Sequence, residues 1–199
     1  MTIGRPRAFD TERAIVQAMR LFWRNGYEGT SLSDLTDELG IARPSLYAAF
    51  GNKEALFLKV LDRYDRETYH FIQAALDAPT ARALAERLVY GACAFHSDPE
   101  NPPGCLMVHG ALIGGEASAS VRKETNHRRS LLRHRIADRL RRAKLEGDLR
   151  EDADPVALSA YLVAILRGIA VEAASGAQPE DLRAIADIAM TAWPDRKAA

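Results

Sequence analysis

The sequence has little cysteine and no excess of charge of either sign. Cys93 and Cys105 are the only two cysteines in 199 residues, and they form neither a CxxC pair nor a zinc-type spacing. A disulfide framework is therefore not expected, and a reducing, cytoplasmic location is. Lys plus Arg and Asp plus Glu both number 27, so the net charge does not indicate a nucleic-acid or membrane partner.

Long apolar runs and catalytic motifs are missing as well. The apolar segment LVAILRGIAV is interrupted by Arg167, so it predicts a buried helix, and no stretch is expected to be long enough to span a bilayer. The basic N-terminus is not followed by an apolar run, which argues against a signal peptide. No HExxH, GxSxG, Walker or GxGxxG motif occurs, and the five histidines show no metal-binding spacing. We therefore expect neither an enzyme nor a metal or cofactor.

Helical periodicity extends over almost the whole chain and predicts an all-α fold of about nine helices. N-cap residues precede most of the periodic segments, and Gly or Asn follows several of them. A loop is predicted at SDPENPPG, between the fifth helix and a short apolar segment. The main predicted helices cover residues 10–25, 31–39, 43–50, 53–75, 80–95, 118–146, 154–174 and a last segment from 179 onward.

Two short helices joined at Gly40 form a predicted helix-turn-helix. On the second of them Leu46 and Phe50 are four residues apart and are predicted to face the core, which leaves Arg43 and Tyr47 on the opposite face. In such motifs the second helix enters the major groove of DNA. Arg43 could then reach a phosphate or a guanine edge, and Tyr47 could donate its hydroxyl to a phosphate.

Residues 10–65 resemble the DNA-binding domain of TetR-family transcriptional regulators. The resemblance rests on TERAIVQAMRLFWRNGYEGTSLSDLTDELGIARPSLYAAFGNKEALFLKVLDRY, and within it on GY..TS...L and G....SLY..F..K..L. It implies a helix-turn-helix domain at 1–52, with a basic arm at 1–9, and a helical ligand-binding and dimerisation domain at 53–199. It also implies a homodimeric repressor, a double-stranded DNA operator and an unidentified small-molecule effector.

The same resemblance assigns the DNA contacts. They are expected at Thr30, Ser31, Ser33, Arg43, Pro44, Ser45, Tyr47 and Lys53. Arg5 and Arg7 lie in a GRPR arm that could enter a narrow minor groove, although an ordinary terminal tail accounts for it equally well. The pair Ala48-Ala49 departs from the family pattern, which often has larger polar or aromatic residues there. Phosphate contacts are therefore better supported than base reading at these two positions.

A ligand pocket is expected between the middle helices. The candidates to line it are Tyr64, Phe71, Phe95, Cys105, Met107, His109, Ile113, His127, Leu131, His134 and Leu166. Ordinary core packing is the alternative for the apolar members, and exposed positions are the alternative for the histidines. Cys105 follows a Pro-Gly pair at a helix start, where a thiol can become reactive. A buried, inert cysteine is the favoured interpretation, and Cys93 is predicted to be core.

The last two helices have broad apolar faces that predict a four-helix dimer interface. The candidate interface residues are Leu158, Leu162, Ile165, Ile169, Ile185, Ile188 and Trp193. The competing class is an all-α small-molecule-binding protein or enzyme whose helix-turn-helix is purely structural. A further alternative is an activator or a nucleoid-type DNA binder that no metabolite releases.

Overall fold

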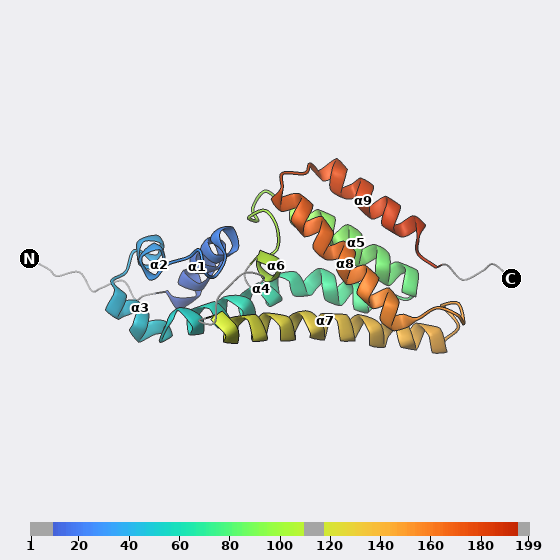
Figure 1. Ribbon diagram of the computed structural model, residues 1–199, viewed down its shortest axis with the longest axis horizontal. Helices are drawn as coiled ribbons and strands as arrows, with labels where there is room; N and C mark the ends of the chain where they lie inside the picture. The colour runs from blue at the N-terminus through green and yellow to red at the C-terminus, as the bar shows by residue number, and fades with distance from the viewer. Residues whose placement is uncertain (1–9, 110–117, 195–199) are drawn as a thin grey trace, which may run out of the picture.

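The computed structural model describes residues 10–109 and 118–194, and these residues form an elongated, all-helical molecule (Figure 1). The described residues contain nine labelled α-helices and no β-strand, in agreement with the predicted fold class. The helices are α1 (Thr11–Asn25), α2 (Leu32–Leu39), α3 (Arg43–Phe50), α4 (Lys53–Leu76), α5 (Ala81–Ser97), α6 (Leu106–His109), α7 (Ala119–Leu145), α8 (Pro155–Ala174) and α9 (Pro179–Thr191).

Short-range hydrogen bonds explain why the first helices begin where the sequence predicts. The Asp10 side chain accepts a hydrogen bond from the N–H of Arg13 at the start of α1, and Asn52 accepts one from Ala55 at the start of α4. These bonds satisfy N–H groups that have no partner within the helix. Gly40 adopts a left-handed conformation, with φ of 63°, and this allows the tight connection between α2 and α3.

The first four helices enclose an aromatic-rich core that forms the head of the molecule. Phe22 packs edge-on against Phe57, with ring centroids 5.0 Å apart, and both side chains are fully buried. Leu35, Leu46 and Phe50 lie in the same cluster of buried residues, so the predicted packing of the helix-turn-helix against α1 is confirmed. Burial of these side chains holds α3 at a fixed angle on the surface of the head.

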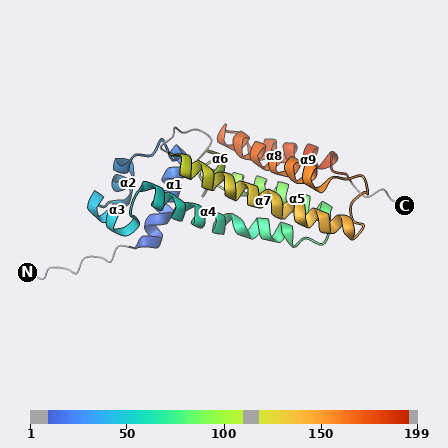
Figure 2. The same ribbon diagram turned by 60° about the horizontal axis from the view of Figure 1, so that its bottom comes forward.

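A second core lies in the helical bundle formed by α5, the far end of α4, and α7 to α9. Leu84, Leu88, Ile136, Leu140 and Leu162 are fully buried there. Figures 1 and 2 show α4 and α7 lying side by side along the length of the molecule. The head and the bundle are therefore connected by continuous helix, because α4 contributes side chains to both cores.

Trp23 of α1 fastens the head to the loop that follows α5. Its indole Nε1 donates a buried hydrogen bond of 2.9 Å to the carbonyl of Gly104. The Trp23 ring stacks on Phe95 with centroids 5.8 Å apart and meets Tyr64 edge-on at 4.8 Å. This aromatic contact joins the helix-turn-helix domain to residues of the bundle.

The expectation that no segment could span a bilayer is wrong by length and composition. α8 has 20 residues, and its apolar window has a mean hydropathy of 1.8. One such helix is weak support for a membrane span, because a core helix of a soluble protein has the same composition. Here α8 packs against α5, α7 and α9, and 33% of its apolar window is buried.

Candidate nucleic-acid interface and ligand pocket

The exposed face of α3 contains the residues that the sequence predicts for DNA contact. Arg43, Pro44 and Ser45 are exposed at its first turn, and Tyr47 one turn later exposes 46% of its surface. No side chain caps the start of α3. A helix start of this kind presents N–H groups and a positive dipole end to an anion such as a phosphate.

The start of α2 lies beside the first turn of α3. Arg43 donates from Nη2 to the Ser33 hydroxyl at 3.2 Å, so an arginine of the second helix meets a serine of the first. Ser31 is exposed and caps α2, accepting from the N–H of Asp34 while its own N–H donates to the Asp34 carboxylate at 2.7 Å. The serines and Arg43 thus form one polar surface at the helix-turn-helix.

Lys53 stands at the start of α4 over the ring of Tyr27, with Nζ 4.2 Å from the ring centroid. Partial burial lowers the pKa of Lys53, while the carboxylates of Glu28 and Asp34 oppose that change. The ammonium is held by a cation–π contact at the edge of the head. It is oriented there without forming an ion pair of its own within the described residues.

Thr30 is placed differently from the other predicted DNA contacts. Its side chain is completely buried, and its hydroxyl donates to the carbonyl of Gly26 at 2.7 Å. The side chain therefore supports the turn before α2 and does not lie on the surface. Arg5 and Arg7 lie outside the described residues.

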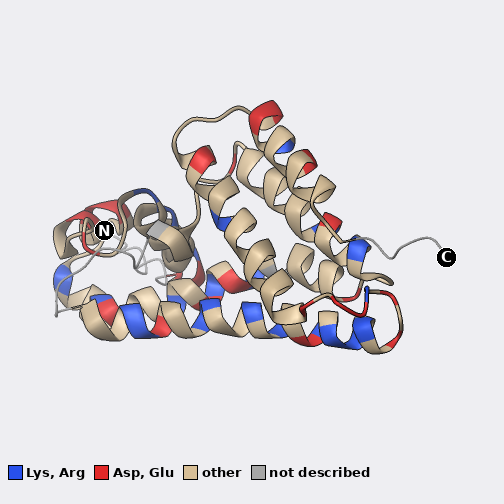
Figure 3. Cartoon of the chain, turned by 45° about the vertical axis from the view of Figure 1, so that its right-hand side comes forward, with Lys and Arg blue, Asp and Glu red and all other residues tan. Residues whose placement is uncertain are grey.

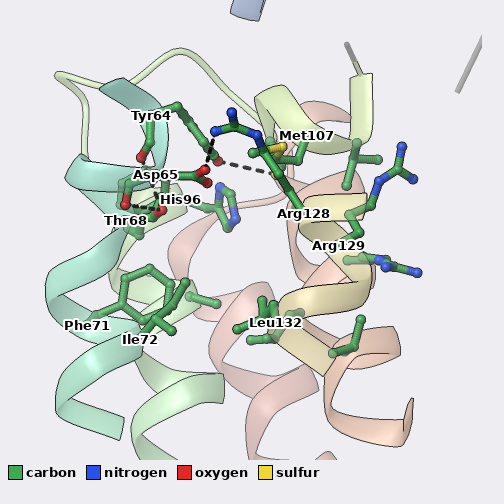
Figure 4. Close-up of a pocket in the computed structure, with 18 of the residues that line it drawn as sticks. Tyr64, Asp65, Thr68, Phe71, Ile72, His96, Met107, Arg128, Arg129 and Leu132 are labelled. Atoms are coloured by element: carbon green, nitrogen blue, oxygen red, sulfur yellow. Dashed lines mark hydrogen bonds and ion pairs between the residues drawn. The ribbon is translucent and has the colours of Figure 1, made fainter. Parts of the chain in front are cut away.

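A cavity of about 360 Å³ lies between α4, α5, α7 and α8. Cys105, just before α6, and Met107, within α6, also line it. Its wall is mostly apolar, with Phe71 and Ile72 of α4 facing Leu132 of α7 across the space in Figure 4. A cavity of this size and lining is typical of a site for a small organic molecule.

One end of the cavity is polar. Arg128 bonds three carboxylates, those of Asp62 at 2.7 Å, Asp65 at 2.6 Å and Glu124 at 2.7 Å. Figure 4 shows it reaching from α7 to Asp65 on α4. These partners raise the pKa of Arg128, whereas burial raises the pKa of Asp65. The charge of Arg128 is therefore already neutralised by protein groups.

Cys105 lies at the same end and accepts a hydrogen bond of 3.2 Å from the Tyr64 hydroxyl. Burial raises the pKa of the Cys105 thiol, and this outweighs the hydrogen bonds and the nearby arginine that act in the opposite direction. The thiol form is therefore favoured, and Cys105 is half-buried, so its inertness stays a prediction. Cys93 is buried in the bundle core, as predicted.

Most of the predicted pocket residues line the cavity, but His127 and His134 do not. Those that line it are Tyr64, Phe71, Phe95, Cys105, Met107, Leu131 and Leu166. His127 and His134 are exposed on the outer surface of α7, and they do not line the cavity because that helix turns its other face inward. The side chain of His109 and all of Ile113 lie outside the described residues.

Sequence reasoning missed the polar residues of the cavity. These are Asp65, Thr68, His96, Arg128, Arg129, Arg135 and Arg167. The sequence offered one signal for the polar residues of α4: Asp65 and Thr68, like Ile72, share a helix face with the predicted pocket residues Tyr64 and Phe71. Charged residues on a long helix normally indicate a solvated face, so the arginines of α7 gave no comparable signal.

The outer face of α8 and α9 carries an apolar groove that no other described residue covers. A shallow groove there is lined by Tyr161, Ile165, Ala184, Ile185, Ile188, Ala189 and Ala192. Ile188 exposes 71% of its surface. Three predicted interface residues need correction, because Leu162, Ile169 and Trp193 are buried in the bundle core, whereas Leu158, Ile165 and Ile185 are half-buried at its edge.

The sequence matches known regulators along most of its length. A family model described as "Bacterial regulatory proteins, tetR family" matches residues 14–60, and one described as "Tetracyclin repressor-like, C-terminal domain" matches residues 82–189. The HTH-type transcriptional repressor ComR of Escherichia coli (strain K12) is 34% identical over 195 residues, which are 96% of this chain and 92% of ComR. BdcR, another repressor of that strain, is 39% identical over 109 residues, 54% of this chain and 55% of BdcR.

Solved structures give the same result for the fold. A cysteine mutant of the TetR family transcriptional regulator CifR, complexed with 26-bp double-strand operator DNA, superimposes with a TM-score of 0.90 at 39% identity, covering 96% of this chain and 100% of that one. The reduced form of Escherichia coli NemR has a TM-score of 0.72 at 18% identity, covering 90% and 94%, and supports the fold alone.

Proposed function

We propose that this chain, which belongs to the TetR family of bacterial regulatory proteins, is a cytoplasmic transcriptional repressor that a small molecule releases from its operator. The observation that carries the proposal is the continuity of α3, α4 and the cavity. The exposed face of α3 precedes α4 by only Gly51 and Asn52, and α4 then supplies Tyr64, Asp65 and Thr68 to the cavity wall. No enzymatic activity is required for this function.

DNA binding would use the polar surface of the helix-turn-helix. Arg43 and Tyr47 would meet phosphates or base edges in the major groove, with Ser31, Ser33 and Lys53 on the flanking backbone. Pro44 and Ser45 complete the first turn of α3. The relative CifR, seen with double-strand operator DNA, supports this assignment. The role of each residue is a proposal that substitution must test.

A homodimer would place two α3 helices on one face of DNA. The apolar groove of α8 and α9, which includes the exposed Ile188, is the surface that a second copy would cover. Two-fold symmetry then calls for a palindromic operator whose half-sites are about 34–36 Å apart. A ligand in the cavity would displace α4 relative to α7 and change this spacing, to the extent of its differential affinity for the two states.

The direct test is fluorescence anisotropy of the purified protein on the DNA upstream of its own gene. A scrambled duplex of equal length is the control, both at about 150 mM salt because affinity depends strongly on salt. We expect a Kd of about tens of nanomolar and a preference of at least about 100-fold over scrambled DNA. Equal, weak binding to the promoter and to genomic fragments as well would contradict the proposal and support a purely structural helix-turn-helix.

A further inference from the structure

We infer that the cavity binds an organic anion, a molecule with an apolar body and a carboxylate or similar group that is paired by Arg129 and Arg167. That this molecule is the effector rests on the proposed function, whereas its chemical class does not. It concerns the chemical class of the ligand and is drawn from the charges and hydrogen bonds of the cavity lining.

Arg129 has no carboxylate partner in the part of the chain that the structure describes. Its Nη2 is buried and has no hydrogen-bond partner within the described residues, and its Nε makes a single long bond of 3.4 Å to the carbonyl of Thr125. In Figure 4 the side chain of Arg129 extends away from the pair formed by Arg128 and Asp65. Arg129 as a whole is half-buried, and a guanidinium nitrogen that is buried without a partner is unfavourable unless an anion completes it.

A second guanidinium, that of the exposed Arg167 on α8, also lines the cavity. Burial and the charge of Arg167 both lower the pKa of Arg129, so the two cations repel each other in the structure. Among the described residues, no carboxylate lies within ion-pair distance of either. Two neighbouring guanidiniums without an acid form the arrangement in which arginine binds carboxylates and phosphates, because planar donors can share one anion.

The other residues that line the cavity favour an anionic ligand over a cationic or neutral one. Asp65 is the only carboxylate that lines the cavity within the described residues, and Arg128 already occupies it, so a cationic ligand would find no free partner. Phe71, Leu132 and Val163 present apolar surface to the rest of a ligand. An apolar body combined with a negative charge therefore fits this lining better than a neutral or cationic molecule of the same shape.

Arg139, another arginine of α7, has a structural role and serves as a comparison for Arg129. Arg139 is buried, does not line the cavity, and donates from Nη2 to the carbonyls of Ala78 and Pro79 at 2.7 and 3.2 Å, while its Nε and Nη1 are buried without a hydrogen-bond partner among the described residues. These bonds hold the turn after α4. Among residues 10–109 and 118–194, Arg129 makes no comparable contact with the backbone of another element, so these residues alone do not explain its position.

The test uses three probes with one apolar body: phenylbutyrate, phenylbutanol and phenylbutylamine. Binding to the full chain is measured by calorimetry at neutral pH without DNA. We expect phenylbutyrate to bind at least about 10-fold more tightly than phenylbutanol, as a hydrogen-bonded charge pair implies, and phenylbutylamine to bind weakest. Equal affinity for the acid and the alcohol would overturn the inference.

Substitutions then locate the charge. Arg129→Met should abolish the preference for the acid while the alcohol binds as before, and Arg129→Lys should retain part of it. Arg133→Met, an exposed arginine of the same helix that does not line the cavity, is the matched control and should change neither. Without ligand, Arg129→Met should raise the Tm, because a half-buried charge without an ion-pair partner among the described residues is removed. A lower Tm together with an unchanged acid preference would assign Arg129 to the scaffold.

Failure of the inference and failure of the proposed function give different results. If phenylbutyrate binds selectively but does not release promoter DNA, the anion site stands and regulation through the cavity fails. If the neutral probe releases DNA as well as the acid does, regulation stands and the anion class is wrong.

Discussion

The start of α2 is held by reciprocal hydrogen bonds between Ser31 and Asp34. The hydrogen bond from the Ser31 N–H is the main cause that lowers the pKa of Asp34, and the bond with the Ser31 side chain is the second. Both interactions favour the carboxylate form. A capping box of this kind orders the first turn of the helix. At the scale of single residues, the surface proposed to face DNA therefore depends on one carboxylate remaining ionised.

This predicts a pH dependence that Asp34→Asn should remove. The folded-state pKa of Asp34 lies below its ordinary value of 3.8, so its contribution to stability is complete above that value and is lost as pH falls through the folded pKa. We expect the Tm of the wild type to exceed that of Asp34→Asn at neutral pH, and the difference to shrink below about pH 4. A pH-independent difference in thermal melts would contradict this account.

The exposed polar groups of α3 should affect DNA affinity without affecting stability. Tyr47→Phe retains the ring and removes the hydroxyl, so we expect about 10-fold weaker operator binding and an unchanged Tm. Arg43→Ala should weaken binding further and, if it contacts phosphate, reduce the salt slope by about 1 per half-site. Anisotropy across a salt series measures both effects.

Arg142→Ala is the matched control for these two variants, since Arg142 is exposed at the far end of α7 and forms only a surface ion pair with Glu146. It should leave DNA affinity unchanged. Equal losses in the control and in Arg43→Ala would indicate a general charge effect, not a contact made by α3.

At the scale of elements, the contact between α1 and the loop after α5 connects the head to the cavity. Trp23 donates to Gly104, and the next residue, Cys105, lines the cavity and accepts from Tyr64. A ligand that moves this loop must move or break the bond to Trp23. The contact is thus a second route, besides α4, by which the cavity could affect the helix-turn-helix.

Trp23→Phe should weaken this coupling. The substitution keeps an aromatic ring against Phe95 and removes the buried donor to Gly104, at a cost of about 1–3 kcal/mol in the free energy of unfolding. We expect nearly unchanged operator affinity and a higher concentration of releasing ligand for half release. An unaltered release curve at unaltered ligand affinity would assign the contact to stability alone.

The crossing of α4 and α5 limits the size of the cavity. A Cβ added at Gly91 would lie 2.8 Å from Cδ2 of Phe71, which lines the cavity. Gly91→Ala should therefore push this ring and weaken ligand binding by about 10-fold, with operator binding preserved. Calorimetry with phenylbutyrate measures the change.

Gly168→Ala is the matched control for that experiment. A Cβ at this position in α8 would meet no atom within 4 Å. The control should leave ligand affinity unchanged and stabilise the helix by up to about 1 kcal/mol. If both variants lose ligand affinity to the same extent, the contact between Gly91 and Phe71 does not set the cavity size.

At the scale of the whole molecule, charges of both signs are spread along the helices, whereas an apolar groove lies on α8 and α9. Figure 3 shows basic and acidic residues interspersed along the long helices. Residues 1–66 contain ten Lys or Arg and nine Asp or Glu, a difference of +1. A single head therefore has little net attraction for DNA, and duplication of the local contacts in a dimer is the expected source of affinity.

Ile188→Glu should separate the proposed dimer. It places a charge in the lining of the apolar groove, where burial against a second copy would be costly. We expect a monomer by analytical ultracentrifugation, with the helical content retained and operator affinity strongly reduced. Leu145→Glu alters an apolar residue that is 88% exposed at the end of α7 and should remain dimeric. A dimeric Ile188→Glu protein would place the interface elsewhere.

The helix boundaries and the helix-turn-helix could be predicted from the sequence because their causes are local. Caps such as Asp10 and Asn52 bond to N–H groups three residues away, and Leu46 and Phe50 share a helix face by their spacing. The all-α class and the exposed face of α3 follow from such patterns. Interactions of this range are fully contained in a short segment of chain.

Only the tertiary structure decided which residues surround the cavity and which apolar faces remain open. Arg128 meets carboxylates more than 60 positions away, so its neutralisation and the isolation of Arg129 depend on the rotation of α7 against α4. Likewise α8 is apolar on several sides, and packing alone separates the buried Leu162 from the groove residue Ile165. The physical reason is that burial depends on the relative placement of distant helices, which local periodicity does not contain.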